Sequence, residues 1–258
     1  MREEQDKITV IIHTYNASQH LDRVLDHLKD FDELLVCDME STDNTLEIAQ
    51  RHGCNIIHFP KGNHQVPEPA RDYAIRQAAH PWILEVDADE LVTPALVSYL
   101  YESIRKPACP DGLYIPRKNY FMGRFMHCLY PNHILRFFRR DVTTWPPYIH
   151  SLPTVNGKVE YISRRRKDLA FIHLADESIS DWMRKSNGYT DEELLRRKDK
   201  HYGAAAFFYR PLHRFYKYYI QKGGFRDGMP GLIRTLLSMF YQVVLLAKMY
   251  EQKKKNPS

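Results

Sequence analysis

The sequence has few cysteines, no apolar segment at its start and no internal repeat. It contains four cysteines in 258 residues, and no two of them form a C-x-x-C pair. We therefore expect neither a disulfide framework nor a structural zinc site, and we expect a reducing compartment. The opening residues MREEQDK are mostly charged and lead directly into a strand-like segment, which predicts that no signal peptide is present.

Acidic residues become rare near the end of the chain. Residues 201–258 contain ten lysines and arginines but only two acidic residues, which is a net charge of +8. Because the whole chain carries +5, the first 200 residues carry −3. The same tail holds 12 of the 32 aromatic residues. A basic, aromatic tail on a slightly acidic body predicts two separate tasks.

The first half of the chain alternates strand-like and helix-like patterns. Apolar strand segments, each followed by a helical pattern, occur in ITVIIHTYN, ELLVCD, CNIIHF and WILEVD. Repeated βα units predict a mostly parallel sheet with helices on both faces. After CPDG, at residues 109–112, shorter strands predict a mixed or antiparallel extension of this sheet. Helical patterns then cover residues 178–200, 204–221 and 229–251.

An acidic cluster ends the fourth strand. Asp87, Asp89 and Glu90 follow the apolar run, and Thr93 and Pro94 have the residue types of a helix start. In an open α/β sheet, ligands bind at the carboxyl ends of the strands. Carboxylates this close repel one another unless a cation or shifted pKa values relieve the repulsion. A hard divalent ion is the simplest solution, and a solvated acidic loop is the alternative for this stretch alone.

Four short motifs stand at the carboxyl ends of the predicted strands. They are HTYN (13–16), CDMESTDNT (37–45), PARDYAI (69–75) and EVDADE (85–90). In this order and spacing they resemble the motifs of glycosyltransferase family 2, the inverting transferases of GT-A fold. Later segments, from YIPRKNYF to the terminal GGFRDGMPGLIRTLL, resemble the subgroup of lipopolysaccharide core-biosynthesis glycosyltransferases. The resemblance spans nearly the whole chain.

This resemblance implies a fold and a division of the chain. Residues 1–200 would form a Rossmann-like GT-A domain that binds a nucleotide-sugar and has a mixed central sheet. Its nucleotide half would cover residues 1–92, and its acceptor half residues 93–200. Residues 201–258 would form a basic, aromatic helical region that associates with a membrane.

The resemblance also implies an activity and a location. The chain would be a metal-dependent inverting transferase that moves a hexosyl or heptosyl group from a nucleotide-sugar donor. The acceptor would be a lipid-linked saccharide such as lipopolysaccharide core. The enzyme would be cytoplasmic and peripheral on the inner face of the cell membrane.

Roles for individual residues follow from the same resemblance. Asp89 would bind Mg²⁺ or Mn²⁺ against the donor diphosphate, where negative charge develops during transfer. His173 would be a further metal ligand, or else a buried histidine bonded to the backbone. Asp87 would contact the ribose or sugar of the donor, with a metal role through water as the alternative. The remaining donor contacts would come from Thr14, Tyr15, Asp38 and Arg71.

The chain departs from the family pattern after its second strand and in its third motif. Met39 and Glu40 stand where the family has serine and glycine, and Asp72 replaces an asparagine. A bulky Met39 beside the base pocket would alter the preference for the donor.

A further departure concerns the base that deprotonates the acceptor hydroxyl. Where the subgroup has a glutamate, this chain has Ser151, preceded by His150. Serine needs a base of its own, so His150 is predicted to take the proton, with Glu90 as the competing candidate. Two rival functions remain. One is transfer to a polyprenyl phosphate, which needs no base, and the other is non-catalytic binding of a nucleotide-sugar.

The tail is predicted to bind lipid rather than nucleic acid. Its basic residues are interleaved with aliphatic runs such as LLSMFYQVVLLA, which suit a bilayer better than a phosphate groove. Polar residues interrupt the apolar segment of residues 232–250. We therefore expect residues 207–250 to dock on an anionic membrane surface without crossing it.

Overall fold

The computed structural model describes residues 3–62, 68–147, 152–174, 178–197 and 202–255. The chain forms two compact units. The first consists of residues 1–118 and 131–174, and the second of residues 119–130 and 175–258.

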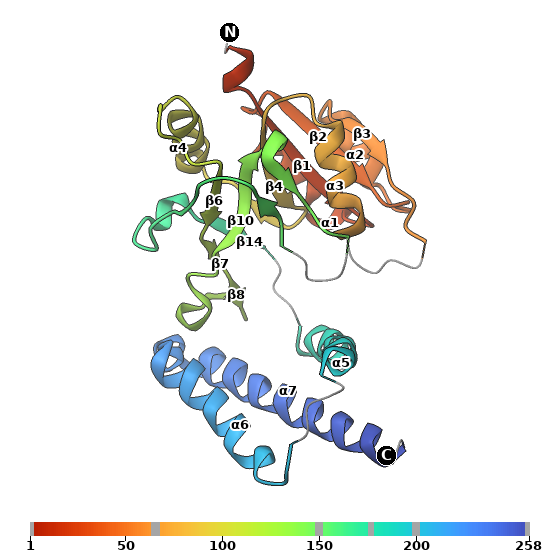
Figure 1. The fold of residues 1–258 in the computed structure, drawn as a ribbon, viewed down its shortest axis with the longest axis vertical. Coiled ribbons are helices and arrows are strands. Elements are labelled where there is room, and N and C mark those ends of the chain that lie inside the picture. Colours follow the sequence, from red (N-terminus) through yellow and green to blue (C-terminus); the bar gives the residue numbers. More distant parts are fainter. Residues whose placement is uncertain (1–2, 63–67, 148–151, 175–177, 198–201, 256–258) are drawn as a thin grey trace. The chain divides into compact units, whose positions relative to one another are not determined.

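A seven-stranded mixed sheet is the centre of the first unit (Figure 1). Its strand order is β13-β6-β10-β4-β1-β2-β3. The strands are β1 (Ile8–Thr14), β2 (Glu33–Asp38), β3 (Asn55–His58), β4 (Trp82–Asp87), β6 (Gly112–Ile115), β10 (Ile134–Arg139) and β13 (Val159–Tyr161). The first four run parallel, and β10 runs antiparallel to both β4 and β6. The predicted parallel sheet with a mixed extension is confirmed.

Helices cover both faces of this sheet, as the βα pattern predicts. They are α1 (Ser18–Asp26), α2 (Thr45–Arg51), α3 (Glu68–Gln77) and α4 (Pro94–Ile104). At the start of α4, the Thr93 side chain accepts a hydrogen bond from the Leu96 N–H, and Pro94 occupies the first turn. This confirms the predicted helix start.

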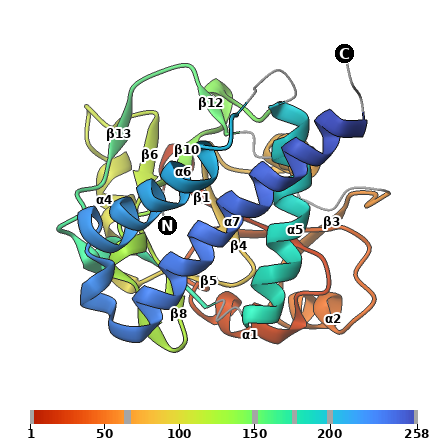
Figure 2. The same cartoon turned by 90° about the horizontal axis from the view of Figure 1, so that it is seen from below.

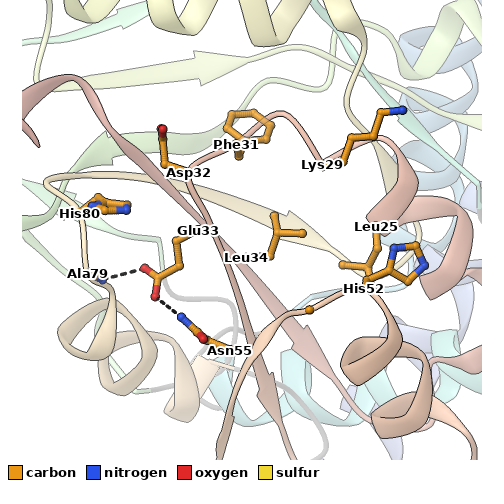
Figure 3. Close-up of a pocket in the computed structure, with 11 residues that line it drawn as sticks. Leu25, Lys29, Phe31, Asp32, Glu33, Leu34, His52, Asn55, Ala79 and His80 are labelled. Carbon is orange, nitrogen blue, oxygen red and sulfur yellow. Dashed lines mark hydrogen bonds between the residues drawn. The ribbon is translucent and has the colours of Figure 1, made fainter. Parts of the chain in front are cut away.

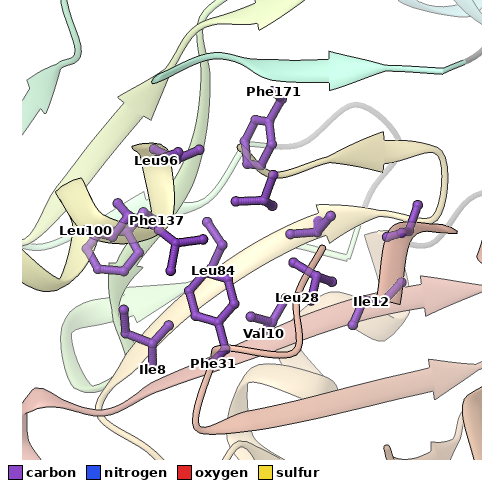
Figure 4. Close-up of a cluster of buried hydrophobic side chains, with 14 of the residues drawn as sticks. Ile8, Val10, Ile12, Leu28, Phe31, Leu84, Leu96, Leu100, Phe137 and Phe171 are labelled. Carbon is purple, nitrogen blue, oxygen red and sulfur yellow. The ribbon is translucent and has the colours of Figure 1, made fainter. Parts of the chain in front are cut away.

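Alternate residues of each strand point to opposite faces and build two separate cores. On one face Val10 and Leu84 pack with Leu28, which follows α1, and with Leu96 and other residues of α1, α2 and α4 (Figure 4). On the other face Ile11 and Ile83 pack with α3 and Trp145. Because both faces are covered, β1 is buried along its whole length, which explains its uninterrupted apolar sequence.

Short elements complete the first unit. Three of them form a small sheet of order β5-β14-β7. Its strand β5 contains Glu90, the last residue of the acidic motif. The short strands are β5 (Glu90–Leu91), β7 (Arg117–Lys118), β11 (Thr143–Thr144), β12 (Thr154–Val155) and β14 (Phe171–His173). Single 3-10 turns lie at Glu4–Asp6, Arg140–Val142 and Lys167–Leu169.

The second unit is mainly helical, and α7 lies against both α5 and α6 (Figure 2). Its elements are β8 (Tyr120–Phe121), β9 (Arg124–Phe125), α5 (Ile179–Arg196), α6 (Ala206–Phe215) and α7 (Gly228–Lys255). A π-helical turn, Tyr216–Gln221, continues α6, and 3-10 turns lie at His127–Leu129 and Gly224–Asp227. The three predicted C-terminal helices are confirmed.

Residues 119–130 belong to this unit because Asp227 and an apolar cluster hold them there. The buried Asp227 carboxylate accepts hydrogen bonds from the backbone N–H groups of His127 (2.8 Å) and Cys128 (3.0 Å). Phe121 and Cys128 pack with Ile233 of α7. The compact units therefore divide the chain elsewhere than between residues 200 and 201, and the functional division at that point stays a prediction.

The segment 224–254 is long and apolar enough to cross a membrane, by length and composition alone. Its most apolar window has a mean hydropathy of 1.4, and 28% of that window is buried inside the protein. A helix that packs on α5 and α6 also passes this test, so docking without crossing stays a prediction.

Candidate active site

The carboxyl ends of β1, β2 and β4 bring three of the predicted site residues together. In the parallel register Thr14 lies opposite Asp38, and His13 lies opposite both Cys37 and Asp87. Parallel strands end at the same edge of a sheet, so motifs separated by tens of residues meet there.

Asp38 joins the loops that follow β1 and β2. Its carboxylate is completely buried and accepts hydrogen bonds from the Thr14 hydroxyl (2.8 Å) and from the Ser41 N–H (2.9 Å) and hydroxyl (2.6 Å). Asn16 strengthens the same junction, because its side-chain oxygen accepts a hydrogen bond from the Thr42 N–H. Asp38 is therefore a loop organiser in this structure, and its contact with a nucleoside stays a prediction.

Tyr15 presents an open aromatic face at this edge. Its side chain is 47% exposed, and the Lys61 ammonium lies 4.1 Å from the ring centroid. Glu40, where the family has glycine, has a left-handed backbone with φ of 64°. Met39 is buried in the core with Ala70 and does not line an open surface.

Arg71 is buried against carboxylates. Its Nη1 donates to Glu85 (2.7 Å) and its Nη2 donates to Asp87 (3.2 Å), while the guanidinium stacks 4.6 Å from the Trp145 ring centroid. Asp72 accepts a hydrogen bond from the Trp145 N–H (3.0 Å), so it fixes the residue on which Arg71 stacks. An asparagine could accept the same hydrogen bond, but only the aspartate also forms an ion pair with Arg76 (3.2 Å).

Asp87 is surrounded by arginines. The shortest contact runs from Arg136 Nη2 to Asp87 Oδ2 (2.7 Å), and Arg117 lies 4.0 Å from the same oxygen. Burial favours a neutral carboxyl, but Arg136, Arg71 and Arg117 outweigh it and hold the pKa of Asp87 well below its usual range. Among the described residues, these three arginines supply the countercharge to Asp87.

Glu90 is completely buried and braces the acidic loop. One oxygen accepts a hydrogen bond from Arg117 (3.0 Å) and the other from the Asp87 N–H (3.2 Å). Burial, together with the neighbouring Asp87, raises its pKa. A carboxyl enclosed in this way is poorly placed to reach an acceptor hydroxyl, which weakens the case for Glu90 as the base.

Asp89 and His173 face each other and remain partly open to solvent. Their side chains are 35% and 23% exposed, and His173 Nε2 lies 3.3 Å from an Asp89 oxygen. The pairing of β14 with β5 sets His173 opposite Glu90, and the Leu174 N–H donates to the Asp89 carbonyl (2.7 Å). His150 and Ser151 lie outside the described residues.

A family model supplies the decisive comparison. The model described as glycosyl transferase family 2 matches residues 9–154, more than half of the chain. The chain belongs to glycosyltransferase family 2. This confirms the resemblance that the four motifs predict.

Two relatives of this glycosyltransferase match it along most of its length. An uncharacterized glycosyltransferase of Rickettsia typhi is 24% identical over 260 residues, covering 95% of this chain and 87% of the relative. The lipopolysaccharide core biosynthesis glycosyltransferase LpsC of Rhizobium meliloti is 23% identical over 262 residues, covering 95% and 92%.

Two solved structures show that the glycosyltransferase has the GT-A fold. S. aureus TarS 1–349 matches with a TM-score of 0.50 and 16% identity, over 96% of this chain and 91% of that one. The mannosyltransferase PcManGT of Pyrobaculum calidifontis matches with a TM-score of 0.51 and 13% identity, over 98% and 76%. It was solved in complex with GDP-Man and Mn²⁺.

The residues at the strand ends of this glycosyltransferase fit a divalent cation only if the substrate supplies further ligands. Among the described residues, no three His, Cys, Asp or Glu side chains lie close enough to hold a metal. Asp89 and His173 provide one carboxylate and one imidazole. Mg²⁺ is commonly held by one or two carboxylates together with substrate phosphates and water, so the donor set suits a cation that binds with a nucleotide.

Sequence reasoning missed the charged partners of the acidic motif. Arg117 and Arg136 come from β7 and β10, and Glu85 lies inside the apolar run of β4. A charged residue in an apolar strand pattern, such as Arg136 in ILRFFRR, was the available signal.

A separate cavity lies near the amino end of β2 (Figure 3). It has a volume of about 400 Å³ and includes Asp32 and Glu33 in its lining. Glu33 already accepts hydrogen bonds from Thr9, Asn55 and the Ala79 N–H, and Asp32 from Tyr101. The cavity is remote along β2 from Asp38, so it is not part of the transferase site.

Proposed function

We propose that this chain is a metal-dependent inverting glycosyltransferase that moves a hexosyl or heptosyl group from a nucleotide-sugar to a lipid-linked saccharide. The observation that carries the proposal is the partly exposed pair of Asp89 and His173 at the end of β4, beside the neutralised Asp87. The relative LpsC, named for lipopolysaccharide core biosynthesis, supports this kind of acceptor. PcManGT, solved with GDP-Man and Mn²⁺, supports a nucleotide-sugar and a divalent cation.

The residues of the site have distinct roles in this proposal. Asp89 and His173 would hold Mg²⁺ or Mn²⁺, which when bound supplies positive charge where the leaving diphosphate becomes more negative. Tyr15 would stack on the base of the donor, and Thr14 and Asp38 would shape the loops around the nucleoside. Asp87 would accept hydrogen bonds from ribose or sugar hydroxyls. Arg71 would hold Asp87 in place, and Arg71 itself would lie close to the phosphates.

The acceptor base remains with His150 in the proposal, because Glu90 is enclosed. An imidazole titrates near neutral pH and is suited to removing a hydroxyl proton. Transfer to a polyprenyl phosphate is the second candidate, since an anionic acceptor needs no base.

Thermal unfolding with a panel of nucleotide-sugars tests the donor site. We expect one of UDP-, GDP-, CDP- or ADP-linked sugars to raise Tm, and to raise it more with Mn²⁺ or Mg²⁺ present. A ligand at 100 times its Kd stabilises the folded state by about 2.7 kcal/mol. A chain whose Tm responds to no donor, with or without metal, would contradict the proposal. Release of nucleoside diphosphate then distinguishes turnover from binding alone.

The second unit supports a location on the inner face of the cell membrane. Phe208, Leu212 and Tyr216 stand one helical turn apart on α6 and its continuation, and are 73%, 62% and 53% exposed. Phe225 and Met229 are also exposed, at 56% and 66%. Large exposed apolar side chains in a row mark an interaction surface, and the basic tail suits anionic lipid.

Two exposed basic residues of the second unit would meet the bilayer in this proposal. Arg210 stacks on Tyr202 and bonds to Gln242, and Arg214 bonds to Tyr218, so both have structural partners. Lys222 and Arg226, in the turn before α7, are exposed, although the Lys222 ammonium also lies 4.8 Å from the Tyr218 ring centroid.

Flotation with anionic vesicles tests this surface. We expect wild-type protein to float, less so in high salt, and the Lys222→Glu/Arg226→Glu variant to float at least several-fold less. Each basic residue near such a surface contributes about 1 kcal/mol. The control Lys29→Glu/Lys106→Glu changes the charge equally on the first unit and should float like wild type. Retention after carbonate extraction would instead indicate a membrane-spanning α7.

A further inference from the structure

The carboxylate of Asp87 is held by guanidinium groups from three separate elements. Arg136 of β10 contacts Oδ2 at 2.7 Å, Arg71 of α3 contacts Oδ1 at 3.2 Å, and Arg117 of β7 lies 4.0 Å from Oδ2. The Asp87 side chain is 29% exposed, whereas those of Arg136 and Arg71 are 10% and 6% exposed. The arginines therefore hold the carboxylate from the protein side and leave part of it open.

This arrangement fixes the plane of the carboxylate. Because Arg136 binds one oxygen and Arg71 binds the other, rotation about the terminal bond of Asp87 would break both charge-assisted hydrogen bonds. Arg71 is itself anchored by the buried Glu85, and Arg117 by the buried Glu90. Arg71, Arg117 and Arg136 thus alternate with the carboxylates of Glu85, Asp87 and Glu90 in one network.

The three arginines around Asp87, here called the clamp, also carry N–H groups that have no acceptor in the described part of the chain. Nη1 of Arg136 and Nε of Arg117 are buried and have no hydrogen-bond partner among the residues that the structure describes. Buried N–H groups are nearly always paired in folded proteins. Ordered water or a bound ligand would therefore have to supply the missing acceptors.

We propose that Arg136 is a positioning residue that orients Asp87 to accept hydrogen bonds from hydroxyl groups of the donor nucleotide. This inference rests on the proposed function, in which Asp87 meets the ribose or sugar. Arg136 acts through Asp87, so its importance depends on the presence of that carboxylate. Arg117 supports the same carboxylate from the side of Glu90.

Nucleotide affinity in a double-mutant cycle tests the clamp. The probes are UDP, GDP, CDP and ADP with Mn²⁺, and the nucleotide that binds wild type best is carried forward by calorimetry. We expect Arg136→Met to weaken its binding by about 10–100-fold, the usual effect of removing a residue that orients a ligand-binding side chain. Arg136→Lys should recover part of the loss, because an ammonium still reaches one oxygen but does not fix the plane.

The cycle separates positioning from a general structural effect. In an Asp87→Asn background, Arg136→Met should weaken binding by less than about two-fold, since neighbouring residues that act together are not additive. Arg139→Met is the matched control: Arg139 lies on the same strand, is 42% exposed and pairs with Asp141, and its loss should leave affinity unchanged. If Arg136→Met does not fold, the nucleotide affinities of Arg136→Lys and of the double variant Asp87→Asn/Arg136→Met test the positioning role instead.

The outcomes distinguish two kinds of failure. If wild type binds none of the four nucleotides, the proposed function is wrong and the clamp falls with it. If wild type binds and Arg136→Met binds equally well, or if the two substitutions are fully additive, the clamp alone is wrong.

Discussion

Asp89→Asn is expected to keep the fold and to lower metal-dependent sugar transfer by at least about 10²–10³-fold, the range found when one electrostatic stabiliser is removed from an active site. Asp89 differs from Asp87 and Glu90 in that its ion-pair partner among the described residues is His173 and not an arginine. Asp87 and Glu90 are neutralised by Arg117 and its neighbours, whereas Asp89 has a 35% exposed side chain beside His173. Asparagine retains the size and one oxygen but loses the charge that attracts a divalent ion.

In Asp89→Asn the metal affinity and the transfer rate should fall, whereas the stability should stay close to that of wild type. We expect Tm without ligand to change little, because a partly exposed pair contributes about 0–1 kcal/mol. Mn²⁺ affinity in the presence of a nucleoside diphosphate should fall, and that measurement does not depend on turnover. His173→Ala should show a smaller loss of Mn²⁺ affinity and of transfer rate. Full activity of Asp89→Asn, or wild-type activity that EDTA does not reduce, would refute a metal role for Asp89.

Arg71→Met is expected to lower the free energy of unfolding by about 3–5 kcal/mol, the usual cost of breaking a buried ion pair from one side. Glu85 is completely buried, and Arg71 binds it at 2.7 Å. Methionine fills similar space but leaves the carboxylate with the more distant His13, at 3.3 Å. Urea denaturation measures the effect.

A matched surface variant gives the comparison. Arg51→Met breaks the Arg51–Asp22 pair, whose side chains are 59% and 55% exposed, and should leave the free energy of unfolding nearly unchanged. Arg71→Met combined with Glu85→Gln should be less unstable than Arg71→Met alone, because no buried charge remains unpaired. Equal losses for Arg51→Met and Arg71→Met would contradict the buried network.

Acid should weaken the buried ion pairs of Glu85 with Arg71 and His13. Burial alone would raise the pKa of Glu85, but His13 and Arg71 outweigh it, and the pKa in the folded state is lowered. The ionised carboxylate therefore stabilises the fold above its ordinary pKa of 4.5, and this contribution is lost as the pH falls below that value. Wild type should therefore lose stability as the pH falls from about 4.5 through the lowered pKa of Glu85 in the folded state. Arg71→Met should lose less over the same range.

The first half of the fold was predictable because its signals are local. The strand ITVIIHT is apolar throughout, Thr93 and Pro94 have the residue types of a helix start, and each helix has its own amphipathic pattern. Parallel pairing then follows from the βα repeat, and it brings Thr14, Asp38 and Asp87 to one edge. Each of these inferences needs only residues within one or two turns or strands of each other.

The partners of these residues were not predictable in the same way. The acidic motif suggested a cation between its carboxylates, but Arg71, Arg117 and Arg136 supply most of the countercharge. Arg136 lies 49 positions from Asp87 in the sequence. The spacing of the acidic residues cannot predict a partner at that distance. Similarly, the sequence suggested that Asp38 meets a nucleoside, while the structure encloses it between Thr14 and Ser41.

The amino-acid sequence by itself determined the family, the βα order of the first unit, the helices of the second and the edge of the sheet at which the candidate site residues meet. Tertiary structure alone decided which carboxylates are neutralised and which remain open, and that residues 119–130 pack with the C-terminal helices. The physical reason is that the charge state and exposure of a carboxylate depend on burial and on groups within a few ångströms. Those neighbours are assembled by packing of β7, β10 and α3, which no local pattern encodes.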